Sequence, residues 1–330
     1  MRLLLLLLTG CLLQLPGFAR ADEALPSWNP GAVRDALIAF VEGASAPGSD
    51  DFIPEAERIA VFDNDGTLWA EQPAYFQLLF AMDRIRALAP EHPEWRENAP
   101  FRAVIENDMK ALAATGEHEL LEVVMAAQSG MSSTQFAGIV QAWIDSARHP
   151  TTGRRYTEMV YQPMQELLTY LRAHGFRTYI VSGGGVDFMR PWTESVYGIP
   201  PEQVVGSSSE LRFEITEDGP RLLREPALHH VNDKAGKPVG IQRFIGRRPV
   251  FAAGNSDGDL EMLQWTTAGE GRAFGLLVHH TDGEREWAYD RASAIGRLDR
   301  ALDEAGPRGW TVVDMARDWR RVYPAIPAEH

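Results

Sequence analysis

Two carboxylates, Asp63 and Asp65, stand two positions apart and are followed by Gly66 and Thr67. The apolar run at 59–62 directly before them is typical of a buried strand in a parallel sheet. Carboxylates this close repel each other unless a cation lies between them, and Mg²⁺ prefers hard oxygen ligands of this kind. One carboxylate could attack phosphorus while the other donates a proton to the leaving group and then accepts one from water. The alternative is a turn without catalytic function, because Asp, Asn and Gly are common turn residues.

A second apolar run, at 178–181, ends in Ser182 and three glycines, of which Gly183 is the first. Glycines leave backbone N–H groups open to an anion, and the start of a following helix adds partial positive charge. These residues therefore indicate an anion site, with a simple glycine-rich turn as the alternative.

Two lysines lie in the segment 231–238, and either could neutralise such an anion. Lys237 directly precedes Pro238, which is favoured in the first turn of a helix, and a helix is expected at 239–245. We favour Lys237 over Lys234 for this reason. A solvated surface lysine is the alternative for either residue.

A further strand-like run at 249–253 is followed by Asn255, Asp257 and Asp259. These oxygen-bearing side chains could complete a metal site at the end of that strand. A solvated acidic turn is the alternative interpretation.

In this order, the four segments resemble the four motifs of the haloacid dehalogenase superfamily. The resemblance implies that Asp63 is the nucleophile and Asp65 the general acid/base. It also implies that Ser182, Gly183 and Lys237 bind the phosphate. Dehalogenating members share the nucleophile but lack the second aspartate, so Asp65 favours phosphatase over dehalogenase activity.

The same resemblance implies a bound Mg²⁺ held by Asp63, Asp65, Asn255 and Asp259. Asn255 departs from the superfamily pattern, which has an aspartate at this position. An amide oxygen can ligate Mg²⁺ but brings no charge, so the affinity should be lower unless Asp257 compensates. A shifted alignment, in which Asp257 is itself the ligand, is the alternative.

Strand-like runs separated by helical patterns predict an α/β fold with a doubly wound parallel sheet, like the Rossmann-type core of the superfamily. In such sheets ligands bind at the carboxyl ends of the strands, where all four segments lie. The helical pattern at 73–159 predicts an all-helical cap domain, inserted into a core formed by 22–72 and 160–330. Polar-apolar alternation at 211–223 predicts a small β-hairpin insertion. Within the cap, helices are expected at 74–88, 101–115, 117–128 and 133–146.

Trp69 and Glu71 follow the first motif and are predicted to contact the substrate. With Tyr75 and Phe76, they could hold a cationic head group by cation–π contact and charge. The superfamily includes phosphoserine and phosphocholine phosphatases, so an amine-bearing phosphoester is one hypothesis. The alternative is that these aromatic side chains only pack the cap against the core.

The formal net charge of the chain is -14, from 46 acidic and 32 basic residues. A protein of that charge repels nucleic acids and anionic membrane surfaces. We therefore expect a small-molecule phosphomonoester as the partner and no nucleic acid.

Residues 1–21 have the features of a signal peptide, with a leucine-rich stretch and a small-x-small cleavage pattern at Ala19 and Ala21. The stretch is shorter than the ~20 residues of a membrane span, so no integral membrane domain is expected. A periplasmic or secreted location follows. The alternative is a lipoprotein anchored at Cys11, the sole cysteine of the sequence.

Taken together, the sequence predicts an exported, Mg²⁺-dependent phosphomonoester hydrolase that acts through a phospho-aspartate. One alternative is a catalytically silent binding protein, if Asn255 has weakened metal binding. A phosphotransferase or pyrophosphatase with the same site is the other.

Overall fold

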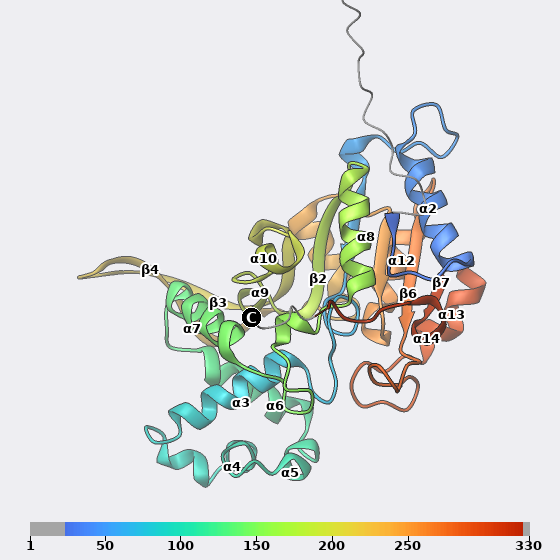
Figure 1. The fold of residues 1–330 in the computed structure, drawn as a ribbon. Helices are drawn as coiled ribbons and strands as arrows, with labels where there is room; N and C mark the ends of the chain where they lie inside the picture. The colour runs from blue at the N-terminus through green and yellow to red at the C-terminus, as the bar shows by residue number, and fades with distance from the viewer. Residues whose placement is uncertain (1–23, 326–330) are drawn as a thin grey trace, which may run out of the picture.

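The computed structural model describes residues 24–325, so the predicted signal peptide and Cys11 lie outside the described residues. A seven-stranded sheet forms the centre of the molecule, in the order β4-β3-β2-β1-β5-β6-β7 (Figure 1). All neighbouring strands pair in parallel except β4, which pairs antiparallel with β3. This arrangement confirms the predicted doubly wound α/β fold. The strands are β1 (Ile59–Phe62), β2 (Arg177–Gly185), β3 (Val204–Thr216), β4 (Gly219–His230), β5 (Phe251–Gly254), β6 (Phe274–His279) and β7 (Thr311–Asp314).

Helices cover both faces of the sheet, because alternate residues of each strand point to opposite sides. In β1, Ala60 and Phe62 belong to the apolar cluster formed with α2 (Ala32–Ser45) and α8 (Gln162–Ala173). Ile59 and Val61 belong to the opposite cluster. That second face is covered by α11 (Gly236–Gly240), α12 (Leu260–Thr267) and α13 (Arg300–Arg308). The whole of β1 is therefore buried, as its continuous apolar run predicts.

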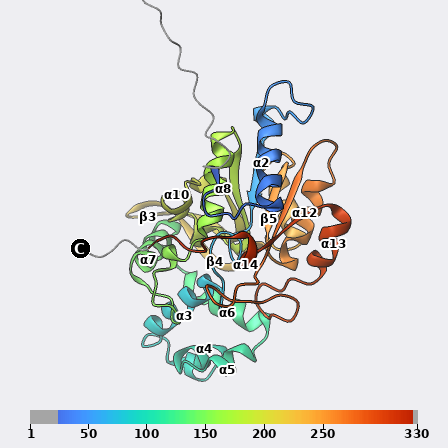
Figure 2. The ribbon, with the colours of Figure 1, turned by 45° about the vertical axis from the view of Figure 1, so that its right-hand side comes forward.

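The first five α-helices between β1 and β2 gather at one end of the sheet, and both ribbon views show them together (Figures 1 and 2). They are α3 (Phe76–Leu88), α4 (Ala99–Ile105), α5 (Met109–Ala113), α6 (Glu117–Gln128) and α7 (Ser133–Ser146). The single helix expected at 101–115 is wrong, since α4 and α5 are separate helices. Asn107 between them has a left-handed φ of 57°, and the side chain of Asp108 accepts the N–H of Ala111 to begin α5.

The β3–β4 hairpin is longer than predicted and is continuous with the central sheet. The first part of β3 pairs in parallel with β2, through Ile180 and Val204. We call the helices α3 to α7 the cap. β4 contacts the cap near its middle, where the backbone N–H of Arg224 donates to the carbonyl of Met131 at 3.0 Å. The hairpin thus joins the core to the cap.

Short elements complete the fold, and β7 at the sheet edge was not expected from the sequence. Across residues 24–325, no helix has the length and apolar character needed to cross a membrane. The remaining elements are η1 (Glu55–Glu57), η2 (Pro93–Arg96), η3 (Tyr156–Glu158), α9 (Val186–Met189), α10 (Thr193–Tyr197), η4 (Pro201–Gln203), the π-helical η5 (Ile241–Ile245), η6 (Asp257–Asp259) and α14 (Met315–Asp318).

Candidate active site

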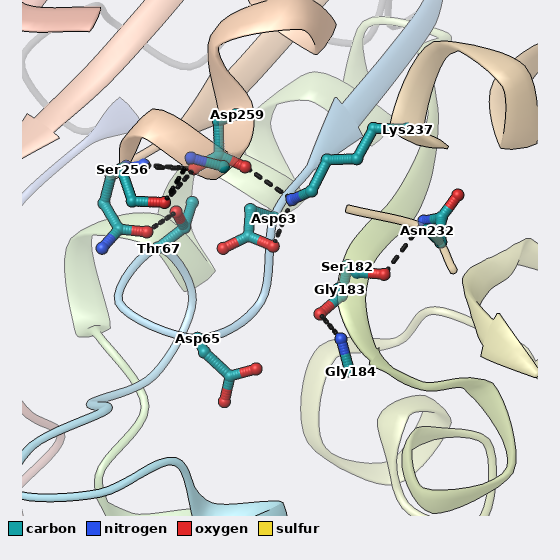
Figure 3. Close-up of polar contacts among 12 residues, drawn as sticks. Asp63, Asp65, Thr67, Ser182, Gly183, Gly184, Asn232, Lys237, Ser256 and Asp259 are labelled. Carbon is teal, nitrogen blue, oxygen red and sulfur yellow. Dashed lines mark hydrogen bonds and ion pairs between the residues drawn. The ribbon is translucent and has the colours of Figure 1, made fainter. Parts of the chain in front are cut away.

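Asp63 follows the last residue of β1, and its backbone N–H continues the ladder to β5 by donating to the carbonyl of Ala253 at 2.9 Å. The ammonium of Lys237 lies between two carboxylates (Figure 3). Its Nζ donates to Oδ1 of Asp63 at 2.7 Å and to Oδ1 of Asp259 at 2.5 Å. Lys237 is 2% exposed, whereas Lys234 is exposed to solvent. The structure therefore brings Lys237, and not Lys234, to the predicted nucleophile.

Burial and crowding of charge dominate the electrostatics of this cluster. Burial raises the pKa of Asp63 well above its usual range, and the carboxylate of Asp259 raises it further, against the opposing effect of Lys237. Burial alone would lower the pKa of Lys237, but Asp259 and Asp63 hold it above its ordinary value. Lys237 is therefore a permanent cation, and it partly offsets the repulsion between its two partners.

Asp65 lies on the turn that follows Asp63 and faces the same cavity. Burial raises its pKa to about 6, although a hydrogen bond from Trp69 opposes the shift. The indole Nε1 of Trp69 donates to Oδ1 of Asp65 at 2.8 Å. A carboxyl group with this pKa can both release and accept a proton near neutral pH, as a general acid/base must.

The structure places Trp69 outside the cavity lining and beside Asp65. Its side chain is 0% exposed and stacks on Trp192, with ring centroids 4.4 Å apart. Phe76 is buried against the other side of Trp69. The alternative from the sequence is confirmed for these two rings, which pack the cap against the core. Trp69 instead acts as a positioning residue for Asp65.

Glu71 faces the cavity but is committed to protein partners. Its Oε1 accepts from Nδ2 of Asn255 and from the hydroxyl of Tyr289, each at 2.7 Å. Burial raises the pKa of Glu71 to about 8. Gly66, with a φ of 73°, lies against the Asn255 side chain. A Cβ at position 66 would be 2.1 Å from Nδ2 of Asn255, so a larger residue does not fit there. These contacts assign Oε1 of Glu71 to the orientation of Asn255.

The loop after β5 holds Asn255 and Asp259 in different roles. Oδ1 of Asn255 accepts from the hydroxyl of Thr67 at 3.0 Å, which fixes the amide beside the first motif. Oδ2 of Asp259 accepts the backbone N–H groups of Asn255 and Ser256 at 2.9 and 3.0 Å. Because Oδ1 of Asp259 is bonded to Lys237, both of its oxygens have protein partners. The structure thus places Asp259 as an anchor of Lys237 at the predicted metal site.

Asp257, the alternative ligand, lies outside the cavity lining and contacts the start of α13. Its Oδ1 accepts the backbone N–H groups of Asp299 at 3.0 Å and Ala301 at 2.9 Å, at the start of α13. A carboxylate in this position caps the helix and stabilises its N-terminus.

The glycine segment after Ser182 is held from three directions. The hydroxyl of Ser182 accepts a hydrogen bond from the N–H of Gly184 at 3.0 Å. The backbone carbonyl of Ser182 accepts one from Nδ2 of Asn232 at 2.9 Å. Gln77 of the cap accepts the N–H of Gly185 at 2.7 Å. Ser182 and Gly183 both line the cavity that contains Asp63, as predicted for an anion site. Asn232 and Gln77 were missed, because an isolated amide side chain gives no signal of its partner in the sequence.

The oxygen atoms of these side chains fit a divalent cation that takes some of its ligands from the protein and the rest from water. Carboxylates of Asp63, Asp65 and Asp259 converge here with one ammonium group, and this excess of negative charge favours a bound cation. Within residues 24–325, no group of three or more His, Cys, Asp or Glu side chains is spaced to hold a metal ion. Mg²⁺ commonly keeps several water ligands, so Asp63, Asp65 and the amide oxygen of Asn255 suit it without a full protein cage.

A cavity of about 440 Å³ connects these residues to the cap and the hairpin. Its catalytic end, defined as Asp63, Asp65, Ser182 and Lys237, comes from the core. Other lining residues belong to α3 and α6 of the cap and to β3 and β4. A ligand in this cavity would therefore contact the core, the cap and the β3–β4 hairpin.

Comparison with known proteins gives a family and a fold. The family model described as haloacid dehalogenase-like hydrolase matches residues 60–264. A structure of a protein with unknown function from Bordetella pertussis Tohama I is similar, with 16% identity, a TM-score of 0.50, and coverage of 78% of this chain and 99% of that chain. A functionally unknown protein from Anaerococcus prevotii DSM 20548 has the same identity and TM-score over 76% of this chain and 86% of that chain. A search of curated proteins gave no match.

Proposed function

Because the chain belongs to the haloacid dehalogenase-like hydrolases, we propose that it hydrolyses phosphate monoesters through a phospho-aspartate on Asp63. The observation that carries this proposal is the buried Lys237 ammonium between Asp63 and Asp259, at the end of an open cavity. The cluster places a carboxylate nucleophile beside a fixed positive charge. That is the arrangement that in-line attack on a phosphoryl group requires.

In the first step, an oxygen of Asp63 attacks phosphorus and the bond from phosphorus to the leaving oxygen breaks. Asp65 gives its proton to that oxygen, so the product is a neutral alcohol. Lys237, the hydroxyl of Ser182 and the amide of Gly183 stabilise the charge on the phosphoryl oxygens.

In the second step, water attacks the phosphorus of the phospho-aspartate. Asp65, now ionised, takes a proton from the water, and the bond between phosphorus and Asp63 breaks. Inorganic phosphate leaves, and both aspartates return to their starting states. The single carboxyl of Asp65 thus serves as acid and then as base.

Asp63, Asp65 and Asn255 would hold Mg²⁺, which supplies neutralisation of phosphoryl charge when it is bound. The hydrogen bonds from Thr67 and to Glu71 support this part of the proposal, because they fix the amide of Asn255 at the edge of the site. A silent binding protein is the weaker alternative, since the nucleophile, the acid/base and the lysine are all in place.

Export to the periplasm or outside the cell is also part of the proposal, and it rests on the leucine-rich stretch and on Ala19 and Ala21. N-terminal sequencing of the protein from a fractionated host tests it. Mature protein that begins at Asp22 in the periplasmic fraction supports export. A lipid-modified Cys11 supports the anchored alternative, and an intact leucine stretch on intracellular protein contradicts both.

Hydrolysis of p-nitrophenyl phosphate tests the central proposal. We expect turnover with Mg²⁺, its loss in EDTA, and its absence in Asp63→Asn. Turnover that is indifferent to EDTA would remove Mg²⁺ from the proposal. If the folded protein with Mg²⁺ cleaves no phosphomonoester, the phosphatase function is wrong.

A further inference from the structure

One wall of the cavity is apolar, although it is open to solvent. Leu121 on α6 is 37% exposed and Val231 after β4 is 55% exposed. Partly exposed apolar side chains that line a cavity commonly mark the part of a site that binds hydrocarbon. We call this group the apolar wall, and it consists of Leu78, Leu121, Val124, Met125, Leu228 and Val231.

The cationic groups that line the cavity are both committed within the protein. Lys237 is held by Asp63 and Asp259. Arg224, the other lining cation, is buried and paired through Nη1 with Asp187. Its Nη2 donates to Oε1 of Gln128 at 3.0 Å, and its Nε donates to the carbonyl of Gln128 at 3.2 Å. A second anionic group on the substrate would therefore face no uncommitted cation among the described lining residues.

The same wall is poorly suited to a cationic leaving group. Among the described lining residues, Tyr75 is the one aromatic side chain, so no aromatic cage surrounds the space. Asp187 is neutralised by Arg224, and Glu71 accepts hydrogen bonds from Asn255 and Tyr289. Asp233, a further lining carboxylate, lies beside Gly183 at the catalytic end, near the charge of Lys237.

We propose that the leaving group is an uncharged, predominantly apolar alcohol whose hydrocarbon part packs on the apolar wall. This inference rests on the proposed phosphatase function and specifies its substrate class. A cavity of about 440 Å³ has room for a phosphoryl group and a hydrocarbon chain of several carbons. Carboxylated and bisphosphorylated esters are disfavoured, because each would bury a charge without a partner.

A series of straight-chain alkyl phosphates, from ethyl to hexyl phosphate, tests the inference. The chemistry at phosphorus is nearly constant in such a series, so the chain length changes mainly the contact with the protein. We expect kcat/KM to rise by up to about fourfold for each methylene, which corresponds to ~0.8 kcal/mol per buried methylene. Hexyl phosphate with a terminal carboxylate should be at least about tenfold poorer than hexyl phosphate. Equal kcat/KM for ethyl and hexyl phosphate, or a faster carboxylated ester, overturns the inference.

The substitution Val124→Thr assigns the effect to the wall, because threonine has nearly the shape of valine. Val124 is partly buried on α6. We expect kcat/KM for hexyl phosphate to fall at least about threefold, with ethyl phosphate changed less than about twofold. Val312→Thr is the matched control, since Val312 is also partly buried but lies on β7 and not in the cavity lining. An equal loss for both esters in Val124→Thr contradicts contact between the chain and the wall.

The same experiments separate failure of this inference from failure of the proposed function. If ethyl and hexyl phosphate are cleaved equally well, the phosphatase function stands and the leaving-group inference is wrong. If neither alkyl phosphate nor p-nitrophenyl phosphate is cleaved by folded protein with Mg²⁺, both are wrong.

Discussion

The catalytic end and the apolar wall are two regions of one cavity, and they are built in opposite ways. At the catalytic end, buried ionised side chains are fixed by short hydrogen bonds, such as those of Lys237 to Asp63 and Asp259. At the apolar wall, partly exposed side chains from the cap and the hairpin offer surface and few directed contacts. Bond making at phosphorus needs fixed angles and charges, whereas retention of a hydrocarbon needs only area removed from water. The difference separates the residues that should control kcat from those that should control the choice of ester.

The largest expected effect is the loss of turnover in Asp63→Asn. Without the nucleophile, kcat should fall by on the order of 10⁴-fold, as in other enzymes that lose a covalent catalyst. The melting temperature should not fall much, because Lys237 keeps its ion pair with Asp259 and the repulsion between Asp259 and Asp63 is removed. Steady-state kinetics and thermal melts measure the two quantities. Substantial residual turnover would place the nucleophile elsewhere.

Lys237→Met should reduce stability strongly, since it leaves two buried carboxylates without their cation. We expect a loss of about 3–5 kcal/mol in the free energy of unfolding. Lys234→Met is the matched control, because Lys234 is exposed, and it should change stability by less than about 0.5 kcal/mol. Urea unfolding of the two variants makes the comparison. Equal effects would contradict the role given to Lys237.

Asn255→Asp should expose the coupling between the metal position and Glu71. The new carboxylate would replace a donor 2.7 Å from Oε1 of Glu71. Above about pH 8, where Glu71 is ionised, repulsion should therefore lower the free energy of unfolding in EDTA by about 2 kcal/mol. Adding Mg²⁺ should stabilise the variant more than the wild type, because the ligand now carries charge. Thermal melts with Mg²⁺ and with EDTA test this. A variant that gains nothing from Mg²⁺ would argue against Asn255 as a ligand.

The smallest expected effect is that of Trp69→Phe, which removes the hydrogen bond to Asp65 but keeps an aromatic ring. We expect kcat to fall about tenfold through poorer positioning of the acid. The indole N–H lowers the pKa of Asp65, so its loss should raise that pKa above about 6. Since Asp65 must be protonated to donate to the leaving group, the alkaline limb of the pH profile should move to higher pH.

Trp143→Phe is the control for that experiment. The indole of Trp143 also donates to a carboxylate, Oδ2 of Asp83, at 2.9 Å, but this pair lies in the cap and not in the cavity lining. The pH profile should be unchanged in this variant. The same shift in both variants would mean that the effect does not arise at Asp65.

The fold could be predicted where hydrophobic patterning is continuous along the chain. The buried run at 59–62 coincides with β1, and the expected helices at 117–128 and 133–146 coincide with α6 and α7. β7 was missed because its four residues include polar Thr311 and Asp314. The hairpin was underestimated, because the alternating pattern covers only its outer part.

The convergence of the four segments could be predicted because each is contiguous in the sequence and lies at the end of a strand. The match to the haloacid dehalogenase-like hydrolase model, over residues 60–264, contains all four segments. Atomic partners could not be predicted, and this is why the packing of Trp69 on Trp192 and the contact of Asp257 with the start of α13 were missed. The apolar wall could not be predicted from the sequence, because its residues come from α3, α6 and β4, which lie together only in the folded chain.

Trapping the intermediate tests the central claim most directly. The enzyme is mixed with Mg²⁺ and hexyl phosphate, quenched in acid during turnover, digested, and analysed by mass spectrometry. We predict one added phosphoryl group on the peptide that contains Asp63, and none in Asp63→Asn. Turnover with the phosphoryl group on another residue, or with no phosphorylated peptide at any quench time, would contradict the account.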